Sequence, residues 1–386
     1  MKTDRRSFLK SAGLLTAAAA VLNPATIFAQ AERGKKSSGS KKMELSWIPY
    51  DAQMRHVFTI ANSSRTTTPI VLTKITWDGY TGYGEAAMPP YLGETQASVM
   101  EFLKKVDLSK FASPFLIEDI MKYVDGIAIN NCAAKAAIDI ALHDLVGKMM
   151  GQPWWKIWGW DPTTCPNTSF TVGLDTEEVV REKTKEAAPY KVIKVKLGRT
   201  EAEDKMMINT IRSVTDTVIC VDANQGWKDK HHALEMIHWC KEHGFIFIEQ
   251  PIGKYNLDDM AWITQNSPLP TIADESCQRL IDVPKLKGVF SGINIKLMKC
   301  TGMREANKMV SLARTLNMKV MIGCMTETSC AISAASHVAC ACDWADLDGN
   351  VLIAHSSDPY DGMKVVDGKV IPSDRPGIGI VKRTDL

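Results

Sequence analysis

The most regular feature of the chain is a series of eight short apolar runs in its C-terminal half. Each run is rich in β-branched and other apolar residues, which is typical of buried strands. Equivalent positions in successive runs lie 22–27 residues apart, the length of one strand, one helix and two short loops. The runs are Ser169–Gly173, Tyr190–Gly198, Val218–Asp222, Phe245–Glu249, Pro270–Asp274, Gly292–Lys296, Lys319–Gly323 and Trp344–Asp348.

Helical patterns separate these runs, for example over Ala202–Val214 and Met303–Leu316. Strands that alternate with helices at this spacing predict a parallel (β/α)8 barrel. No clear eighth helix follows the last run, so we predict a modified TIM barrel of the (β/α)7β type. Such barrels place their chemistry at the C-terminal ends of the strands, where most of these runs end in a polar residue.

The first part of the chain has a different pattern. Strands are predicted at Val57–Ile60, at Ile70–Trp77 and from Thr81 after a turn. Helices are predicted at Ala97–Val106, Ile117–Tyr123 and Asn131–Met150, the last ended by Gly151 and Pro153. We therefore predict an α+β domain over residues 43–160, completed by residues 350–386, and a barrel domain over residues 161–349.

The second run carries two lysines, Lys194 and Lys196, which share one face because side chains alternate along a strand. An edge strand with solvated lysines is the simpler alternative. However, the sixth run ends in Lys296, and strands 2 and 6 of eight lie on opposite sides of a barrel. Lys196 and Lys296 therefore face each other across the predicted site.

Strands 3, 4 and 5 end in Asp222, Glu249 and Asp274, on the arc between the two lysines. Three converging carboxylates repel one another unless a cation lies among them, and an all-oxygen ligand set favours Mg²⁺. A substrate carboxylate on that ion would have its α-carbon between the lysines. One lysine could remove the α-proton and the other return a proton to the opposite face, while the metal stabilises the enediolate.

The segments Lys194-Val-Lys196, Val221–Trp227, Ile248–Pro251, Ala273–Ser276 and Asn294–Lys299 resemble the enolase superfamily in its muconate-lactonising subgroup. The handling of an α-proton by a base and Mg²⁺ is known chemistry of that superfamily. The resemblance runs from about Met43 to the C-terminus. It implies that Lys196 and Lys296 are the two bases, that Lys194 helps to neutralise the substrate carboxylate, and that the α+β domain caps the barrel.

Three further groups are expected to bind substrate. Asp346 and Asp348 end strand 8, opposite the metal, and their Asp-x-Asp pattern is similar to that of dipeptide epimerases, which use it to hold the substrate's N-terminal amine. Loop-capping aspartates beside Gly349 are the alternative. Thr171, at the end of strand 1, is a further candidate contact. Arg65, in a predicted loop, would pair with a side-chain carboxylate, or else be a solvated loop arginine.

Composition limits the other possibilities. The net charge of +2 implies no nucleic-acid partner. Zinc is not expected, because Cys340 and Cys342 lack a second pair at ligand spacing. Several of the ten cysteines, such as Cys220 and Cys324, lie inside predicted strands and are expected to be buried thiols. Residues 1–31 resemble a twin-arginine export signal and residues 32–42 a flexible linker. This predicts a periplasmic protein without stable membrane insertion, or a cytoplasmic one if the signal is not used. The sequence is compatible with a homo-oligomer but does not decide the oligomeric state.

Together these features predict a Mg²⁺-dependent dipeptide epimerase that inverts the α-carbon of the C-terminal residue. The expected reaction interconverts L-Ala-D-Glu and L-Ala-L-Glu, with cell-wall peptides as their source. Broader dipeptide specificity, a cycloisomerase or an o-succinylbenzoate synthase are the alternatives among enzymes. An exported peptide-binding protein on an inactive barrel is the alternative from another class.

Overall fold

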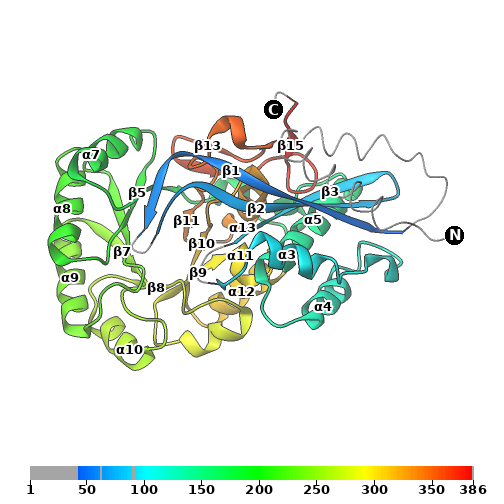
Figure 1. The fold of residues 1–386 in the computed structure, drawn as a ribbon. Helices are drawn as coiled ribbons and strands as arrows, with labels where there is room; N and C mark the ends of the chain where they lie inside the picture. Colours follow the sequence, from blue (N-terminus) through cyan, green and yellow to red (C-terminus); the bar gives the residue numbers. More distant parts are fainter. Residues whose placement is uncertain (1–41, 61–62, 89–91, 385–386) are drawn as a thin grey trace, which may run out of the picture.

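A computed structural model of the chain describes residues 42–60, 63–88 and 92–384. Its main body is a barrel surrounded by helices, and a three-stranded antiparallel sheet with its own helices lies against one side of the barrel (Figure 1). The expected export signal lies outside the described residues, as does all but the last residue of the expected linker. No helix in the described part is both long and apolar enough to span a bilayer.

The barrel sheet is parallel and follows chain order, as the spacing of the apolar runs predicts. Its register brings the strand ends to one level, with Lys196 beside Asp222 and Asp222 beside Glu249. The side chains at these positions therefore meet at one end of the barrel. The eight strands are β4 (Ser169–Val172), β5 (Val192–Lys196), β6 (Val218–Asp222), β7 (Phe245–Glu249), β8 (Thr271–Ala273), β9 (Gly292–Lys296), β10 (Lys319–Gly323) and β11 (Trp344–Asp346).

Helices cover the outside of the barrel, except in two places. After β8 the chain forms a 3₁₀ helix, Leu280–Leu286, which contains Pro284 and so lacks a backbone donor needed by an α-helix. After β11 the described residues contain no α-helix, which confirms the (β/α)7β type. The barrel helices are α7 (Glu177–Glu186), α8 (Glu201–Arg212), α9 (Lys230–Glu242), α10 (Leu257–Asn266), α11 (Leu297–Cys300), α12 (Met303–Thr315) and α13 (Ser329–Ala339).

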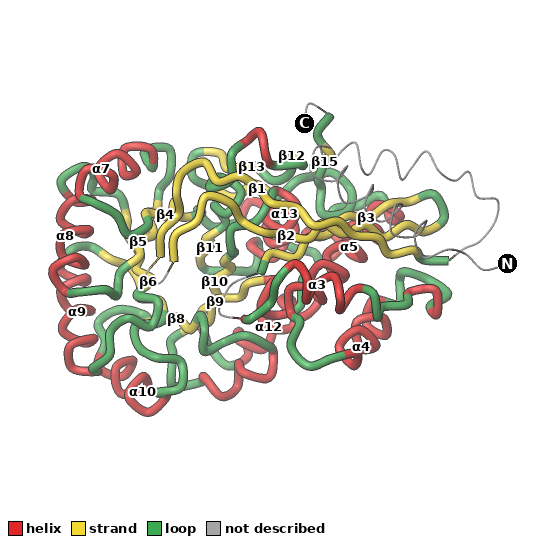
Figure 2. Tube along the Cα trace, in the orientation of Figure 1, coloured by secondary structure: helices red, strands yellow, loops and turns green. Residues whose placement is uncertain are grey.

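The capping domain is built on a long hairpin that runs beside the barrel (Figure 2). The third strand of this sheet, β3, packs directly on the helix α5. Gly82 and Gly84 allow the close approach, because a Cβ at either position would lie 2.1 Å from a carbonyl oxygen of α5. The elements are β1 (Glu44–Ile60), β2 (Ser63–Trp77), β3 (Tyr80–Ala87), α3 (Gln96–Leu103), α4 (Ile117–Ile127), α5 (Cys132–Met150) and α6 (Trp154–Ile157).

The hairpin strands are longer than the sequence suggests, and this corrects the placement of Arg65. We expected a loop up to Pro69, but Arg65 lies on β2 and pairs with Phe58 of β1. Proline normally interrupts a central strand. Pro69 is tolerated because the pairing of β3 begins only at Ile70, so that β2 has a free edge at the proline.

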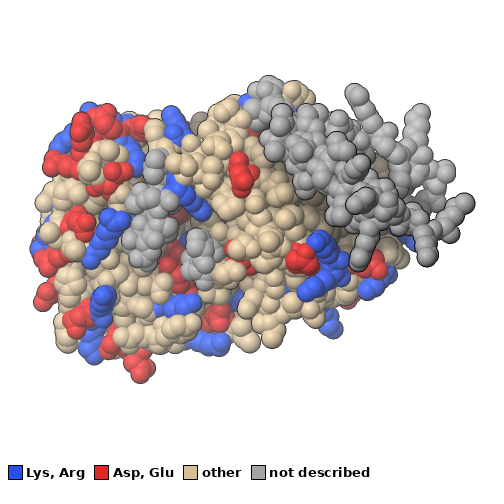
Figure 3. Space-filling view, viewed as in Figure 1, with Lys and Arg blue, Asp and Glu red and all other residues tan. Residues whose placement is uncertain are grey.

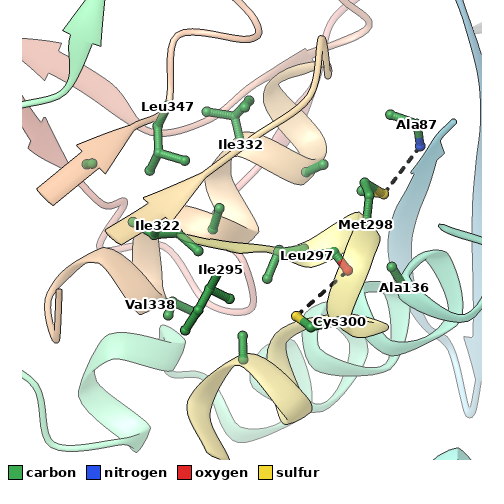
Figure 4. Close-up of a cluster of buried hydrophobic side chains, with 14 of the residues drawn as sticks. Ala87, Ala136, Ile295, Leu297, Met298, Cys300, Ile322, Ile332, Val338 and Leu347 are labelled. Carbon is green, nitrogen blue, oxygen red and sulfur yellow. Dashed lines mark hydrogen bonds between the residues drawn. The ribbon is translucent and has the colours of Figure 1, made fainter. Parts of the chain in front are cut away.

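Several contacts join the capping domain to the barrel, and two of them involve β3. Met298 of α11 accepts a hydrogen bond from the Ala87 backbone through its sulfur at 3.3 Å, within a cluster of buried apolar residues (Figure 4). Glu85 of β3 accepts a hydrogen bond from the Thr328 backbone at the start of α13, 2.9 Å away. The C-terminal tail packs beside β1 and adds β12 (Tyr360–Asp361), β13 (Lys364–Val366), β14 (Lys369–Ile371) and β15 (Val381–Lys382).

The barrel closes between its first and last strands, β4 and β11, and we call this junction the seam. The two strands share no continuous ladder, only one isolated bridge between Thr168 and Ala345. Side chains complete the closure. Leu347 N donates to Thr168 Oγ1 (2.8 Å), Ser169 Oγ donates to Asp346 Oδ1 (2.6 Å) and Thr171 N donates to Asp348 Oδ2 (2.6 Å).

Charged side chains of both signs are interspersed over the visible face, mainly around the barrel helices (Figure 3). Neither sign forms a broad continuous field there. This distribution agrees with the near-neutral net charge of the sequence.

Candidate active site

Three carboxylates meet at the C-terminal end of the barrel. Asp222 and Glu249 are the last residues of β6 and β7, and Asp274 follows the last residue of β8. All three are buried, and one oxygen of each lies within 4.8 Å of the others. The structure therefore brings together the three predicted metal ligands.

The two candidate bases flank this group. Lys196 ends β5, and its Nζ lies 2.6 Å from Asp222 Oδ2. Lys296 ends β9, and its Nζ lies 2.7 Å from Asp274 Oδ2. Since β5 and β9 are four strands apart in a barrel of eight, the amines approach from opposite sides.

Lys194 lies one layer deeper and is fully buried. Its Nζ is 2.7 Å from both Glu249 Oε2 and Asp346 Oδ2, and 3.4 Å from Asp222 Oδ2. Burial alone would lower the pKa of this lysine, but the three carboxylates raise it well above its ordinary value. The charged form of Lys194 is therefore favoured between the carboxylate group and β11, where it can neutralise negative charge.

The pKa values of two carboxylates in this group are shifted in opposite directions. Burial opposes ionisation of Asp222, but Lys196 and Lys194 hold its pKa at about 2. Burial and the charge of Asp222 instead raise the pKa of Glu249 to about 7. Glu249 Oε2 also lacks a hydrogen bond, since its contact with Lys194 is an ion pair without hydrogen-bond geometry. An oxygen-only, buried group with one incompletely satisfied carboxylate fits a hard divalent cation such as Mg²⁺.

Two residues that the sequence analysis did not single out hold the carboxylates in place. Lys299 is fully buried, and its Nζ donates to Asp274 Oδ1 (2.5 Å), Asp274 O (2.7 Å) and Asn294 O (2.9 Å). Asn294 Nδ2 donates to Glu249 Oε1 at 2.6 Å. Both lie in the Asn294–Lys299 segment that carries the family resemblance, and a charged residue three positions after Lys296 was the available signal.

Asp346, the last residue of β11, and Asp348, two residues after it, lie across the barrel from β7 and its Glu249. Burial favours the neutral form of Asp346, but Lys194 and Lys196 keep its pKa low. Burial and the charge of Asp346 raise the pKa of Asp348 to about 7. Thr171, the third candidate on this side, donates its backbone N–H to Asp348. The loop-capping alternative accounts for part of this geometry, because both aspartates also close the seam.

Arg65 reaches the barrel from the capping domain. Its Nη2 donates to Thr326 Oγ1, 2.7 Å away, in the segment after β10. The guanidinium is partly buried, which lowers its pKa, so the alternative of a solvated loop arginine does not describe it. Glu327 next to Thr326 is buried, and burial raises its pKa to about 8. The site residues thus come from the hairpin as well as from the barrel.

No two of the ten cysteines are bonded to each other in the structure, and nine are buried. Cys220 is buried as expected, whereas Cys324 is only half-buried. The group that could hold a metal ion consists of three carboxylates and includes no cysteine or histidine.

The barrel with its capping domain, three carboxylates and opposed lysines defines a class of enzymes that move a proton beside a carboxylate. Residues 44–159 match the family described as mandelate racemase / muconate lactonizing enzyme, N-terminal domain, and residues 175–386 match the enolase C-terminal domain-like family. The chain belongs to the enolase superfamily, as the sequence resemblance indicates. Within it the chain is an isomerase of the epimerase type, as its relatives indicate.

Three relatives illustrate the similarity. The chain is 59% identical over 385 residues to an L-Ala-D/L-Glu epimerase of Bacteroides thetaiotaomicron, covering 98% of this chain and 99% of the relative. It is 39% identical to an L-Ala-D/L-amino acid epimerase of Pedosphaera parvula, over 84% of this chain and 95% of the relative. A solved dipeptide epimerase from Enterococcus faecalis, complexed with Mg and L-Leu-L-Tyr, superposes with a TM-score of 0.80 at 31% identity, over 88% of this chain and 99% of that one.

Proposed function

We propose that this protein epimerises dipeptides at the α-carbon of the C-terminal residue, with Mg²⁺ as cofactor and L-Ala-D-Glu and L-Ala-L-Glu as the preferred pair. One observation carries the proposal. Two lysines on opposite sides of a carboxylate group face a pair of buried aspartates across the same barrel mouth. This arrangement has a place for a carboxylate at one end of a small substrate and for an ammonium group at the other.

Asp222, Glu249 and Asp274 would hold the Mg²⁺ ion. Bound there, the ion supplies positive charge for the substrate carboxylate as the α-proton leaves. Lys194 adds a fixed cation on the inner side of the same carboxylate, because its three protein carboxylates keep it protonated. The backbone of a dipeptide then spans from this group to Asp346 and Asp348, which would receive the N-terminal ammonium.

The proton transfer uses one lysine on each face. A neutral amine on one side takes the α-proton as the C–H bond breaks, and the ammonium on the other side gives a proton to the same carbon. The configuration is inverted without net change in composition. Each lysine has a carboxylate beside its amine, since Lys196 Nζ lies 2.6 Å from Asp222 Oδ2 and Lys296 Nζ lies 2.7 Å from Asp274 Oδ2.

The preference for glutamate rests on Arg65. Its guanidinium lies near the barrel mouth beside Thr326 and can form a bidentate pair with a side-chain carboxylate. The similarity to the Bacteroides thetaiotaomicron enzyme supports the same substrate. The similarity to the Pedosphaera parvula enzyme, whose name covers amino acids in general, supports a broader range as the second candidate.

The setting of the reaction follows from the N-terminal sequence. Residues 1–31 resemble a twin-arginine signal, so we propose export to the periplasm, where cell-wall peptides would supply the substrate. A fusion of this segment to a reporter enzyme, followed by fractionation, tests this. Retention of the reporter in the cytoplasm would contradict export.

Proton exchange in D₂O tests the reaction and its specificity. The Mg²⁺-loaded protein is incubated with dipeptides of L-Ala followed by varied residues, and a mass gain of one unit is followed by mass spectrometry. We expect deuterium at the α-carbon of the second residue, fastest for Glu. Fast exchange with many residues would favour the broader range, and no exchange with any dipeptide would favour a cycloisomerase or synthase.

The matched variants Lys196→Ala and Lys296→Ala test the two-lysine mechanism. Each should lose epimerisation but retain Mg²⁺ binding. Each should also retain exchange with one diastereomer, and the two variants should retain it with opposite diastereomers. Exchange with the same diastereomer in both variants would contradict lysines on opposite faces.

A further inference from the structure

Two cysteines face each other at the end of the barrel remote from the active site. Cys165 Sγ and Cys340 Sγ are 2.8 Å apart, and both residues are buried. The ten cysteines all lie in the described part of the chain, and no other pair there makes a sulfur–sulfur contact. Cys342, two residues from Cys340, instead lies 3.4 Å from the Val338 carbonyl.

The position of this pair relates it to the seam. Cys165 lies four residues before the start of β4, and Cys340 lies four residues before the start of β11. These are the two strands that meet without a continuous ladder. At the active-site end, Asp346 and Asp348 join them. At the opposite end the direct backbone link is the isolated bridge Thr168–Ala345, with a hydrogen bond from Thr164 Oγ1 to the Cys340 carbonyl (3.1 Å) nearby.

We infer that Cys165 and Cys340 form a disulfide that covalently closes the barrel seam at its stability-determining end. The sulfur atoms already face each other within 1 Å of the covalent S–S length of about 2.05 Å, so only a small side-chain movement is needed. The bond would connect positions 175 residues apart and so would restrict the unfolded chain strongly. The N-terminal end of a barrel is where structural rather than catalytic features are found.

The chemistry requires a disulfide oxidant, for which glutathione disulfide is the probe. One cysteine thiolate attacks a sulfur of the oxidant and releases one glutathione thiolate. The second cysteine thiolate then attacks the mixed disulfide and releases the other. The two protein thiols are oxidised to one disulfide, one glutathione disulfide is reduced to two thiols, and the two protons pass to the released thiolates.

The environment sets the conditions of the test. The contact with Cys340 and burial raise the pKa of the Cys165 thiol, so the reactive thiolate is scarce in the closed protein. Oxidation should therefore be faster when the seam opens transiently. For this reason the protein is incubated with glutathione disulfide both without and with urea at a concentration below its unfolding transition.

After incubation, free thiols are blocked with N-ethylmaleimide and the protein is digested without reductant. We expect a peptide pair linked through Cys165 and Cys340, with the other eight cysteines alkylated. We also expect the thermal midpoint of the oxidised protein to be about 5 °C above that of a sample kept in dithiothreitol. Epimerisation at 25 °C should be the same in both samples.

The variants Cys340→Ser and Cys342→Ser form a matched pair. The first should lose both the linked peptide and the redox dependence of the midpoint, whereas the second should keep both. Quantitative alkylation of Cys165 and Cys340 after oxidation in urea would overturn the inference. So would a link from Cys165 to Cys342, or a midpoint that does not respond to oxidation although the bond forms. None of these outcomes depends on the proposed substrate.

Discussion

Replacing Asn294 by leucine should separate metal binding from stability. Asn294 Nδ2 donates to Glu249 Oε1 at 2.6 Å, while its Oδ1 is buried without a hydrogen-bond partner among the described residues. Loss of a hydrogen bond to a carboxylate lowers the free energy of unfolding by about 1.5–3 kcal/mol, but removal of a buried acceptor without a partner raises it by about 1–3 kcal/mol. Leucine has nearly the shape of asparagine. The free energy of unfolding without metal should therefore change by less than about 1 kcal/mol.

The affinity for Mg²⁺ should fall in the same variant, because Glu249 loses the donor that fixes its orientation. Loss of such a supporting contact typically weakens metal binding by about 10–100-fold. The assay follows the thermal midpoint as Mg²⁺ is increased. A ligand that binds only the folded state raises stability by RT ln(1 + [L]/Kd), so the curve should shift to about 10–100-fold higher Mg²⁺.

Met321→Leu is the control for repacking, since Met321 is the direct strand neighbour of Asn294 on β10. It should leave the Mg²⁺ curve in place. Unchanged Mg²⁺ affinity in Asn294→Leu, together with a lower midpoint without metal, would refute the reasoning. Asn294 would then serve only to pack against Gly323, where an added Cβ would lie 2.6 Å from its Oδ1.

Three further predictions concern groups farther from the metal ligands. Burial and Asp346 raise the pKa of Asp348 to about 7, and Asp348 must be ionised to bind an ammonium group, so kcat/KM should fall about tenfold per pH unit below pH 7. The variant Asp348→Asn should not show this decrease. An identical pH profile of kcat/KM in both proteins would contradict the role of Asp348. Burial lowers the pKa of His337 to about 4. The unfolded chain then binds the extra proton between pH 6.5 and 4, so stability should fall by roughly 3 kcal/mol over that window as pH decreases, and His337→Asn should show a correspondingly flatter denaturation series. Arg65→Ala should lower kcat/KM for L-Ala-D-Glu by roughly 100-fold but change kcat/KM for L-Ala-L-Leu by less than about threefold. Equal losses with both dipeptides would mean that Arg65 serves to hold the capping domain against the barrel.

The barrel and its chemical centre could be predicted because both depend on a simple repeat. Five of the apolar runs carry a predicted base or metal ligand at the C-terminal end, and parallel strands in register bring those ends together. Lys196, Asp222, Glu249, Asp274 and Lys296 are therefore placed by chain order alone. Their catalytic and metal-binding roles remain predictions until the variants are measured.

Other features depend on contacts that no local pattern records. Lys299 holds Asp274 only because the short α11 turns it back beneath the strand ends. The strand position of Arg65 depends on how far β3 extends along β2, since this decides whether Pro69 can be tolerated. The proximity of Cys165 and Cys340 arises from closure of the whole barrel and has no signature in their spacing of 175 residues.

The two aspartates of the seam have a consequence for how substrate range can diverge. Asp346 and Asp348 hold the first and last barrel strands together through Ser169 and Thr171, so exchanging them to accept a different amine end would also loosen the scaffold. Arg65 takes no part in closing the seam: it comes from the hairpin of the other domain and reaches the barrel at Thr326, after β10. With the roles proposed above, changes of specificity should therefore accumulate at the hairpin, while Asp346 and Asp348 stay unchanged. The fold in this way assigns the two ends of the substrate to different domains, so that one end can change without the other.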